Sequence, residues 1–327
     1  MDNTIILGDN LEVLKDLPDE FAQLIYIDPP FNTGKKQTRT RVKTKSILPP
    51  SSTEAADSTT YSKVSTRKGF AGKEYASQKI EEAGSYSDKF VDFESFLIDR
   101  VKASLHCLKK NGSIMIHLDY REVHYIKVAM DKLIGRDKFM NEIIWAYDYG
   151  ARSKNKWSAK HDTILWYVMN PNDYVFNYDA MERIPYMAPS LVTADKAAKG
   201  KTLTDVIWQT IVPTMGKEKT NYPTQKPLGL LNKIIPVHTN KDDFVLDFFA
   251  GSGTTGESAA IHNRKFVLVD KNFEATDVCK NRLINYSPVF VDKSVTALEK
   301  LLNVVPTEPT ETESEILSEN NLEEKKQ

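Results

Sequence analysis

The amino-acid sequence predicts an α/β protein built on a mostly parallel sheet. Short apolar runs that end on an acidic residue occur three times: Leu24–Ile27 before Asp28, Phe244–Leu246 before Asp247, and Phe266–Val269 before Asp270. Unbroken apolar runs of this length are typical of parallel strands that are buried on both faces. Helical patterns separate the runs, and alternating strands and helices indicate a sheet with right-handed crossovers.

The other predicted elements follow the same alternation along the chain. The clearest helical pattern places apolar residues on one face from Phe93 to Leu108 and ends near Asn111-Gly112. Two further strands are predicted, at Ser113–Leu118 and beginning at Glu142–Trp145. Two shorter helices are predicted at Leu230–Val237 and Asp277–Ile284. Ligands of such sheets bind beyond the carboxyl ends of the strands, so we expect the acidic residues that follow the three runs to face one site.

Length and composition fit one large catalytic domain with a smaller attached module. The chain has 327 residues, of which 40% are apolar, and this is enough to bury a full core. The start lacks a basic segment followed by an apolar one, and no run approaches the roughly 20 apolar residues of a membrane helix, so we expect a cytoplasmic protein. Cys107 and Cys279 form no CxxC pair, and the chain has no HExxH motif, which predicts buried free thiols and no metal site.

The net charge of −1 is distributed unevenly along the chain. Residues 307–327 hold seven Glu against two Lys, which leaves +4 on the rest of the chain. We expect this acidic tail to be disordered. A modest positive excess on the remaining body fits a surface that binds phosphate groups better than an acidic surface would.

Two stretches interrupt the α/β pattern. Residues 35–84 are rich in Ser, Thr, Lys and Arg and are expected to form a long, partly disordered loop. The first part of this loop, Lys35–Lys45, carries six positive charges and no acid. Residues 151–220 begin with basic side chains and continue with aromatic ones, a composition that suits a separate small module.

A glycine-rich segment, Asp247–Gly256, follows one predicted strand and opens a predicted helix. Its glycines allow a ligand to approach the backbone closely and permit positive φ. A phosphate-binding P-loop needs Lys and then Ser or Thr after its last glycine, whereas Glu257 and Ser258 follow here, which argues against a nucleoside triphosphatase. The spacing also matches GxGxxG, with Asp270 about 20 residues further on. The loop alone therefore leaves the cofactor open between a dinucleotide and a methyl donor.

The turn Asp28-Pro29-Pro30-Phe31 decides between them, and it directly follows the run Leu24–Ile27. Consecutive prolines fix φ and remove two backbone donors, so a rigid turn presents a carboxylate, free carbonyl oxygens and an aromatic face. These groups match the demands of methylating an aromatic amine, whose lone pair is delocalised into the ring. Asp28 and the Pro29 carbonyl can each accept one N–H and turn the lone pair toward the methyl donor. Phe31 can stack on an extruded base, which is worth roughly 1–3 kcal/mol and offsets much of the unpairing cost.

With these motifs the sequence resembles the beta class of DNA amino-methyltransferases, which includes the modification enzymes of restriction systems. Over most of residues 1–290 the motifs occur in the expected order: Gly8-Asp9, the tetrad, the strand around Ser113, Tyr222–Pro227, the glycine loop and Asp270. The resemblance implies a Rossmann-like, seven-stranded sheet with one antiparallel strand. It also implies a circular permutation that puts the cofactor-binding elements last in the chain.

The cofactor implied by this resemblance is S-adenosylmethionine. Asp9 matches the acid near the adenine ring, Asp270 matches the acid that holds the ribose hydroxyls, and Lys226 suits the carboxylate of the methionine part. The full set of residues implied to hold the cofactor is Asp9, Thr224, Lys226, Asp247, Phe249, Gly251, Ser252, Gly253, Thr254 and Asp270.

The substrate implied by the resemblance is a flipped adenine in double-stranded DNA. An initial Asp in the tetrad accompanies adenine-N6 methylation in this family, and cytosine-N4 methylation is the alternative. Phe31 stands where Tyr is more frequent, but it keeps the stacking face. The residues expected to contact DNA are Lys35, Lys36, Arg39, Arg41, Arg152, Lys154 and Lys156, with the aromatic residues Trp157, Tyr167 and Tyr174 as further candidates. A cognate restriction endonuclease and a homodimer are both compatible with the resemblance, but the sequence leaves the oligomeric state and the partner nuclease open.

The predicted domain organisation combines these assignments. Residues 1–150 form the first part of the catalytic domain, with the basic loop 35–84 inserted, and residues 221–290 form its cofactor-binding part. Residues 151–220 form a target-recognition module, and residues 291–327 form a C-terminal extension that ends in the acidic tail.

Two other protein classes explain less of the sequence. A nicotinamide-dependent oxidoreductase accounts for the glycine loop and Asp270 but leaves the Asp28–Phe31 turn unexplained. A catalytically silent DNA-binding protein accounts for the basic stretches but for neither the turn nor the loop.

Overall fold

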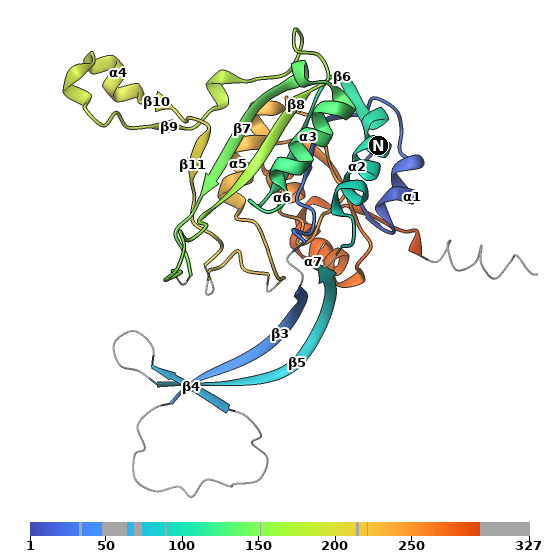
Figure 1. Cartoon of the computed structure of the whole chain (residues 1–327), viewed down its shortest axis with the longest axis vertical. Helices are drawn as coiled ribbons and strands as arrows, with labels where there is room; N and C mark the ends of the chain where they lie inside the picture. Colours follow the sequence, from blue (N-terminus) through green and yellow to red (C-terminus); the bar gives the residue numbers. More distant parts are fainter. Residues whose placement is uncertain are drawn as a thin grey trace, which may run out of the picture.

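A nine-stranded sheet forms the centre of the molecule in the computed structural model, which describes residues 1–32, 35–47, 64–68, 74–88, 90–150, 152–213, 216–220 and 222–294 (Figure 1). The strand order is β11-β7-β8-β6-β2-β12-β13-β1-β14. The bounds of these strands are β1 (Thr4–Leu7), β2 (Ala22–Ile27), β6 (Leu108–Leu118), β7 (Phe139–Ala146), β8 (His161–Val168), β11 (Val206–Trp208), β12 (Phe244–Asp247), β13 (Lys265–Asp270) and β14 (Val289–Asp292).

The expected Rossmann-like sheet with one antiparallel strand is confirmed. Only β8 runs antiparallel to its two neighbours, β6 and β7, and every other adjacent pair in this sheet is parallel. The seven strands from β7 to β1 make up the expected sheet, and β11 and β14 add one short strand at each edge.

The circular permutation is visible in the pairing of β2 with β12. Leu24 lies opposite Val245 and Ile25 lies opposite Leu246, although more than half of the chain separates the two strands. The strand that carries the tetrad therefore comes first in the chain and lies next to the strand that opens the glycine loop. This adjacency brings the two motifs to one edge of the sheet.

Helices cover both faces of the sheet because the strands are apolar on both. In β2, Ile25 and Ile27 pack into one core cluster, whereas Leu24 and Tyr26 pack into the other. The first cluster includes residues of α1 (Asn10–Lys15), α2 (Phe93–Ser104) and α3 (Val123–Ile134). The second includes residues of α5 (Leu228–His238), α6 (Thr254–Ile261) and α7 (Phe273–Leu283). The unbroken burial predicted from the apolar runs is confirmed for β2, whose six residues are all buried.

The long helix predicted from Phe93 to near Asn111 is wrong at its C-terminal end. Helix α2 ends at Ser104, a short 3-10 helix η2 (Leu105–Cys107) follows, and Leu108 begins β6. Leu108 continues the helical spacing of apolar residues, but it lies opposite Ala22 of β2. Pairing with a strand distant in sequence therefore overrides the local helical period. The remaining 3-10 helices of the sheet domain are η3 (Arg136–Lys138) and η6 (Ile284–Tyr286).

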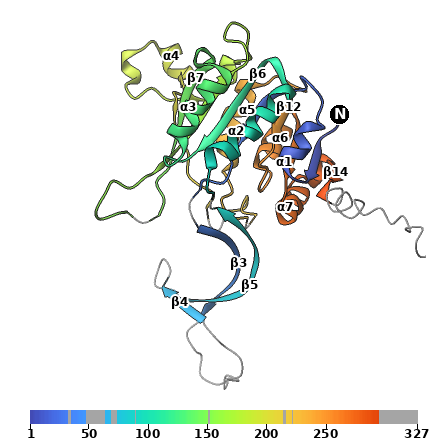
Figure 2. The same ribbon diagram turned by 45° about the vertical axis from the view of Figure 1, so that its right-hand side comes forward.

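The expected loop at residues 35–84 is wrong for the parts that the structure describes. They form a three-stranded antiparallel sheet in the order β3 (Lys35–Ile47), β5 (Glu74–Asp88) and β4 (Val64–Lys68). Figures 1 and 2 show this sheet as an arm that extends away from the main body. Thr, Val and Tyr favour strands, and the many charged residues between them conceal this preference in a composition argument.

The separate module predicted at residues 151–220 is also wrong in its boundaries. Strand β8 lies inside the main sheet, and β11 extends it at one edge. What projects from the body in Figures 1 and 2 is the segment that contains β9, β10 and α4. Its elements are η4 (Tyr178–Ala180), β9 (Arg183–Ile184), η5 (Pro189–Leu191), α4 (Ala194–Lys199) and β10 (Lys201–Thr202), with β9 and β10 paired antiparallel.

The structure describes only the first residues of the predicted C-terminal extension. The C-terminal extension expected from residue 291 begins inside β14, which pairs with β1. The acidic tail at residues 307–327 lies outside the described residues. In the described part of the chain, none of the helices has the length and apolar character needed to cross a membrane.

Candidate active site

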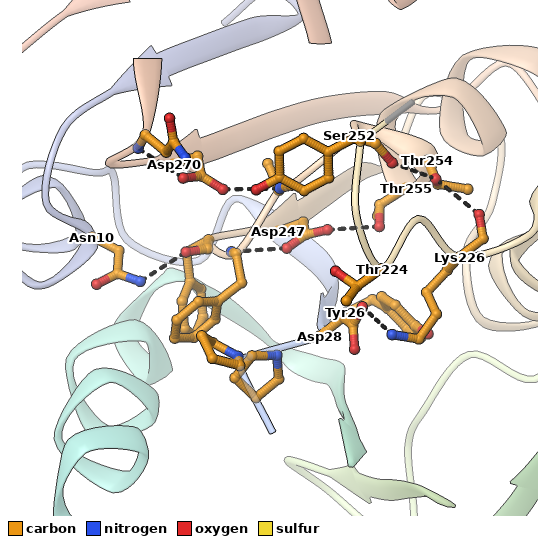
Figure 3. Close-up of a pocket in the computed structure, with 18 of the residues that line it drawn as sticks. Asn10, Tyr26, Asp28, Thr224, Lys226, Asp247, Ser252, Thr254, Thr255 and Asp270 are labelled. Atoms are coloured by element: carbon orange, nitrogen blue, oxygen red, sulfur yellow. Dashed lines mark hydrogen bonds and ion pairs between the residues drawn. The ribbon is translucent and has the colours of Figure 1, made fainter. Parts of the chain in front are cut away.

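The tetrad and the glycine loop line one pocket of about 560 Å³ at the carboxyl edge of β2, β12 and β13. Figure 3 shows Asp28 on one side of this pocket and Asp247 and Asp270 further along it. All four tetrad residues, Asp28, Pro29, Pro30 and Phe31, contribute to its wall. The volume lies in the range that binds small organic ligands and cofactors. The sequence-based expectation that the three acidic residues would face one site is confirmed.

The two oxygens of the Asp28 carboxylate have different surroundings. Oδ2 accepts a hydrogen bond from the Lys226 ammonium, in a pair whose side chains are 19% and 10% exposed. Oδ1 is buried and has no hydrogen-bond partner among the described residues. A buried acceptor without a donor costs about 1–3 kcal/mol, so the pocket holds an oxygen that a ligand N–H would satisfy.

The glycine loop makes the sharp turn between β12 and α6 with two residues at positive φ. Gly251 has φ +51° and Gly253 has φ +75°, and Gly253 is the N-cap of α6. A side chain at Gly253 would also place Cβ 2.9 Å from the Cys279 sulfur. The predicted need for glycine at these two positions is therefore confirmed.

Asp247 holds this loop in place through two hydrogen bonds. One of its carboxylate oxygens accepts from the Phe249 amide at 2.9 Å, and the other accepts from the Thr255 hydroxyl at 2.6 Å. The pKa of the Asp247 carboxyl is raised from 3.8 to about 7, mainly by burial and also by the nearby carboxylates of Asp28 and Asp270, although the two hydrogen bonds lower it. The site therefore concentrates negative charge, which suits a ligand that carries positive charge.

Asp270 ties the end of β13 to the glycine loop. Its Oδ2 accepts from the Gly251 amide and its Oδ1 accepts from the Asn272 amide, both at 2.9 Å. Burial raises the pKa of this carboxyl too. Each carboxylate oxygen can accept a second hydrogen bond, so Asp270 keeps capacity for ligand hydroxyls on its pocket side.

Most residues expected to hold a cofactor line this pocket. These are Thr224, Lys226, Asp247, Phe249, Gly251, Ser252, Thr254 and Asp270. Lys226 lies there with its ammonium on Asp28. Gly253 is the N-cap of α6 and is not among the residues that line the pocket.

Asp9 is the expected cofactor residue that the structure places elsewhere. Its carboxylate is the N-cap of α1, where it accepts from the Leu11 amide at 2.9 Å, and it lies 3.8 Å from Arg100. Its neighbour Asn10 lines the pocket instead and donates to the Phe248 carbonyl at 2.8 Å. Asp9 thus caps its own helix and does not line the described pocket, so its assignment to the cofactor stays a prediction.

Residues that sequence reasoning missed complete the pocket wall. Arg100 on α2 donates through Nε to Asn10 Oδ1 at 2.7 Å, and its guanidinium lies 3.9 Å from the centre of the Phe96 ring. Both Arg100 and Phe96 line the pocket, as does Tyr26 of β2. In the sequence, the signal that could have predicted these residues is the arginine beside the apolar face of the helix that begins at Phe93.

A buried polar chain supports the tetrad from behind. The Tyr26 hydroxyl lies 2.7 Å from His117 Nδ1, His117 Nε2 lies 3.2 Å from Asp162, and the Tyr147 hydroxyl donates to Asp162 at 3.1 Å. The His117 ring is stacked with Phe31, with 6.0 Å between ring centres. Burial raises the pKa of Tyr26 well above its ordinary value, so this hydroxyl stays protonated.

The residues expected to contact DNA differ in their exposure and in the elements on which they lie. Arg152, Lys154 and Lys156 are exposed, with Arg152 2.8 Å from Asp148, and Trp157 is fully exposed. Tyr167 is wrong as a DNA contact, because it is fully buried and donates to Asp131. Tyr174 packs edge-on against Trp166. The remaining four, Lys35, Lys36, Arg39 and Arg41, all lie on β3.

The sequence also predicted buried free thiols and no metal site. Cys107 and Cys279 are free and buried, as expected. Within the described ranges, no group of three or more His, Cys, Asp or Glu side chains has an arrangement that holds a metal ion.

The carboxylate-bearing turn and the glycine loop share one pocket at the edge of a mostly parallel sheet. This arrangement is typical of α/β enzymes that bring a bound cofactor next to a second substrate. Comparison with known proteins specifies the family. A family model described as DNA methylase, named N6_N4_Mtase, matches residues 22–281. The chain belongs to this family of DNA methylases.

Relatives and solved structures agree with this membership. The chain is 30% identical over 298 residues to a DNA adenine methyltransferase, YhdJ, of Escherichia coli K12, covering 86% of this chain and 82% of that protein. It is 26% identical to the type II methyltransferase M.HpaI of Haemophilus parainfluenzae, covering 86% and 74%. The crystal structure of an M1.HpyAVI–SAM complex superposes with a TM-score of 0.52 at 22% identity, covering 86% of this chain and 98% of that one, which supports the fold.

Proposed function

We propose that this chain transfers a methyl group from S-adenosylmethionine to N6 of an adenine in double-stranded DNA. The observation that carries the proposal is the unpaired, buried Asp28 Oδ1 in the same pocket as the glycine loop. The 30% identity to a protein named as a DNA adenine methyltransferase supports adenine as the base.

The pocket fits a cationic nucleoside cofactor. Asp28, Asp247 and Asp270 give it three carboxylates, and a sulfonium and an ammonium group would balance them. In our proposal Asp270 holds the ribose hydroxyls, and Asp247, Thr224 and the loop residues hold the methionine part. When bound, S-adenosylmethionine supplies an activated methyl group next to the tetrad.

The tetrad prepares the amine to receive that group. Asp28 Oδ1 accepts one N–H of the exocyclic amine and the Pro29 carbonyl accepts the other, which turns the nitrogen lone pair out of the ring plane. Phe31 stacks on the base and contributes roughly 1–3 kcal/mol, against an extrusion cost of a few kcal/mol. After transfer, one proton leaves the nitrogen for Asp28 or for water.

Basic residues in two segments of the chain support DNA as the substrate. We propose that Lys35, Lys36, Arg39 and Arg41, on the arm that begins just after the tetrad, contact DNA phosphates, together with exposed Arg152, Lys154 and Lys156. Such contacts bind any sequence and position the duplex. A cognate restriction endonuclease and a homodimer belong to this proposal, as does a cytoplasmic location. The type II name of M.HpaI supports the restriction partner.

The decisive test measures the methylated nucleoside. Purified protein is incubated with labelled S-adenosylmethionine and unmethylated duplex DNA, and the DNA is then digested to nucleosides. We expect the label in N6-methyl-2′-deoxyadenosine. Label only in N4-methylcytosine nucleosides would replace adenine by cytosine, which the name of the matching family model also covers. Absence of label in DNA would contradict the proposed reaction.

A further inference from the structure

Lys226 connects the two halves of the pocket. Its backbone carbonyl accepts a hydrogen bond from the Thr254 hydroxyl at 3.1 Å, and Thr254 is the first residue of α6 after the glycine loop. Its side chain runs the other way, to the tetrad, where the ammonium pairs with Asp28 Oδ2 and lies 4.6 Å from the centre of the Phe31 ring (Figure 3). The same residue therefore contacts the cofactor loop through its backbone and the catalytic turn through its charge.

We propose that Lys226 is a positioning residue for the target amine, which it orients through Asp28. The inference rests on the proposed methyl transfer and assigns the lysine to the base-binding half of the site. By holding Oδ2, the ammonium fixes the rotation of the carboxylate and leaves Oδ1 as the oxygen that faces the amine. This role differs from the one implied by family resemblance, in which Lys226 binds the methionine carboxylate of the cofactor.

Geometry favours Asp28 as the partner of this ammonium. The Lys226 residue is 9% exposed, so its charge needs a close counter-ion, and Asp28 is the acid with which the described structure pairs it. The ammonium also lies within reach of the Phe31 ring, where a cation is attracted by the ring electrons. A lysine held by two members of the tetrad is well placed to order that turn.

The charges in the pocket are the second reason to assign Lys226 to Asp28. Asp28 shares the pocket with two other buried carboxyls, and its charge contributes to the raised pKa of Asp247. The other two cations that line the described pocket are Arg100 and Lys271. Arg100 is engaged with Asn10 and with the Phe96 carbonyl, and the charge of Lys271 acts on Asp270. Lys226 is thus the cation that offsets the negative charge of Asp28 before any ligand is bound.

The test separates a role on Asp28 from a role on the cofactor carboxylate. The variant is Lys226→Met, which keeps an unbranched side chain one atom shorter and removes the charge, and Lys233→Met is the matched control. Lys233 lies outside the pocket and pairs with Glu182. Circular dichroism checks folding, and Lys226→Gln replaces the methionine variant if that one does not fold.

Two quantities are measured on the full-length protein. Calorimetry gives the Kd of S-adenosylhomocysteine, which has the methionine carboxylate, and of methylthioadenosine, which lacks it. Rapid quench gives the single-turnover rate at saturating S-adenosylmethionine, on the duplex that the wild-type protein methylates. We expect both Kd values to stay within threefold of wild type and the rate to fall about 100-fold, since a misplacement of about 1 Å costs a factor of that order.

Each other outcome has a defined meaning. A single-turnover rate within threefold of wild type would overturn the inference. So would a tenfold loss of affinity confined to S-adenosylhomocysteine, because it would assign the ammonium to the cofactor carboxylate. If wild type itself transfers no methyl group to DNA, the proposed function fails and the inference falls with it, a result distinct from failure of the variant alone.

Discussion

Replacing Asp247 by Asn should stabilise the cofactor-free protein at neutral and higher pH while weakening its cofactor binding. The carboxyl is fully buried, and burial raises its pKa from 3.8 to about 7. A folded-state pKa above the unfolded one means that the native state binds the proton more tightly. Stability contributed by this group is therefore greatest below pH 3.8 and is lost as pH rises toward 7.

The size of this loss follows from the two pKa values. The difference between 3.8 and about 7, at about 1.36 kcal/mol per pKa unit, corresponds to about 4 kcal/mol. Asn keeps an oxygen to accept from the Phe249 amide and has no charge to desolvate, so its stability lacks this pH dependence. The gap in unfolding free energy between variant and wild type should widen by up to about 4 kcal/mol from pH 4 to pH 8.

Urea unfolding of both proteins without cofactor, at several pH values across this range, measures the gap directly. Calorimetry with S-adenosylhomocysteine at pH 8 measures the accompanying loss of affinity. A gap that stays constant with pH would refute the reasoning, because it would show that Asp247 ionises in the folded protein as it does in the unfolded chain. A variant less stable than wild type at pH 8 would refute it as well.

Three further predictions test the tetrad, its support and the arm. Asp28→Ala should abolish methyl transfer and leave the Kd of S-adenosylhomocysteine within about threefold, because the acceptor is removed and the glycine loop is intact; retained turnover in the single-turnover assay would exclude the proposed role of the carboxylate. Tyr26→Phe should cost about 1–3 kcal/mol of unfolding free energy, because buried His117 loses its partner at 2.7 Å, and an unchanged urea midpoint would contradict this. Exchange of Lys35 and Lys36 for Gln should weaken DNA binding and reduce the slope of log affinity against log salt by about 0.9 for each phosphate that the variant no longer neutralises, and an unchanged slope in fluorescence anisotropy would remove them from the interface.

The strands at the centre of the fold were predictable because their signals are local. An apolar run that ends on Asp28 or on Asp247 needs no distant partner to be recognised as a buried strand with a polar end. The expected helices Leu230–Val237 and Asp277–Ile284 also lie within α5 and α7 or extend one residue beyond, since their apolar spacing matches the helical period. The edges were less predictable, as the arm and the short strands β11 and β14 show.

The wrong placement of β8 in a separate module has a different physical origin. His161–Val168 has the apolar composition of a strand, but it follows an exposed basic stretch, and composition alone groups the two together. Its position between β6 and β7 depends on two antiparallel pairings with distant residues, such as Ile116 with Leu165. Local composition carries no information about such pairings.

By itself the sequence determined the class of fold, the turn that presents Asp28 and the glycine loop, because short-range rules of burial, proline rigidity and glycine freedom specify each of them. Only the tertiary structure decided which groups meet. It turned Asn10 rather than Asp9 into the pocket, and it placed the ammonium of Lys226 on a carboxylate 198 positions away in the chain. The physical reason is that a side chain's partner in a folded sheet depends on how distant segments pack, and no local pattern encodes that packing.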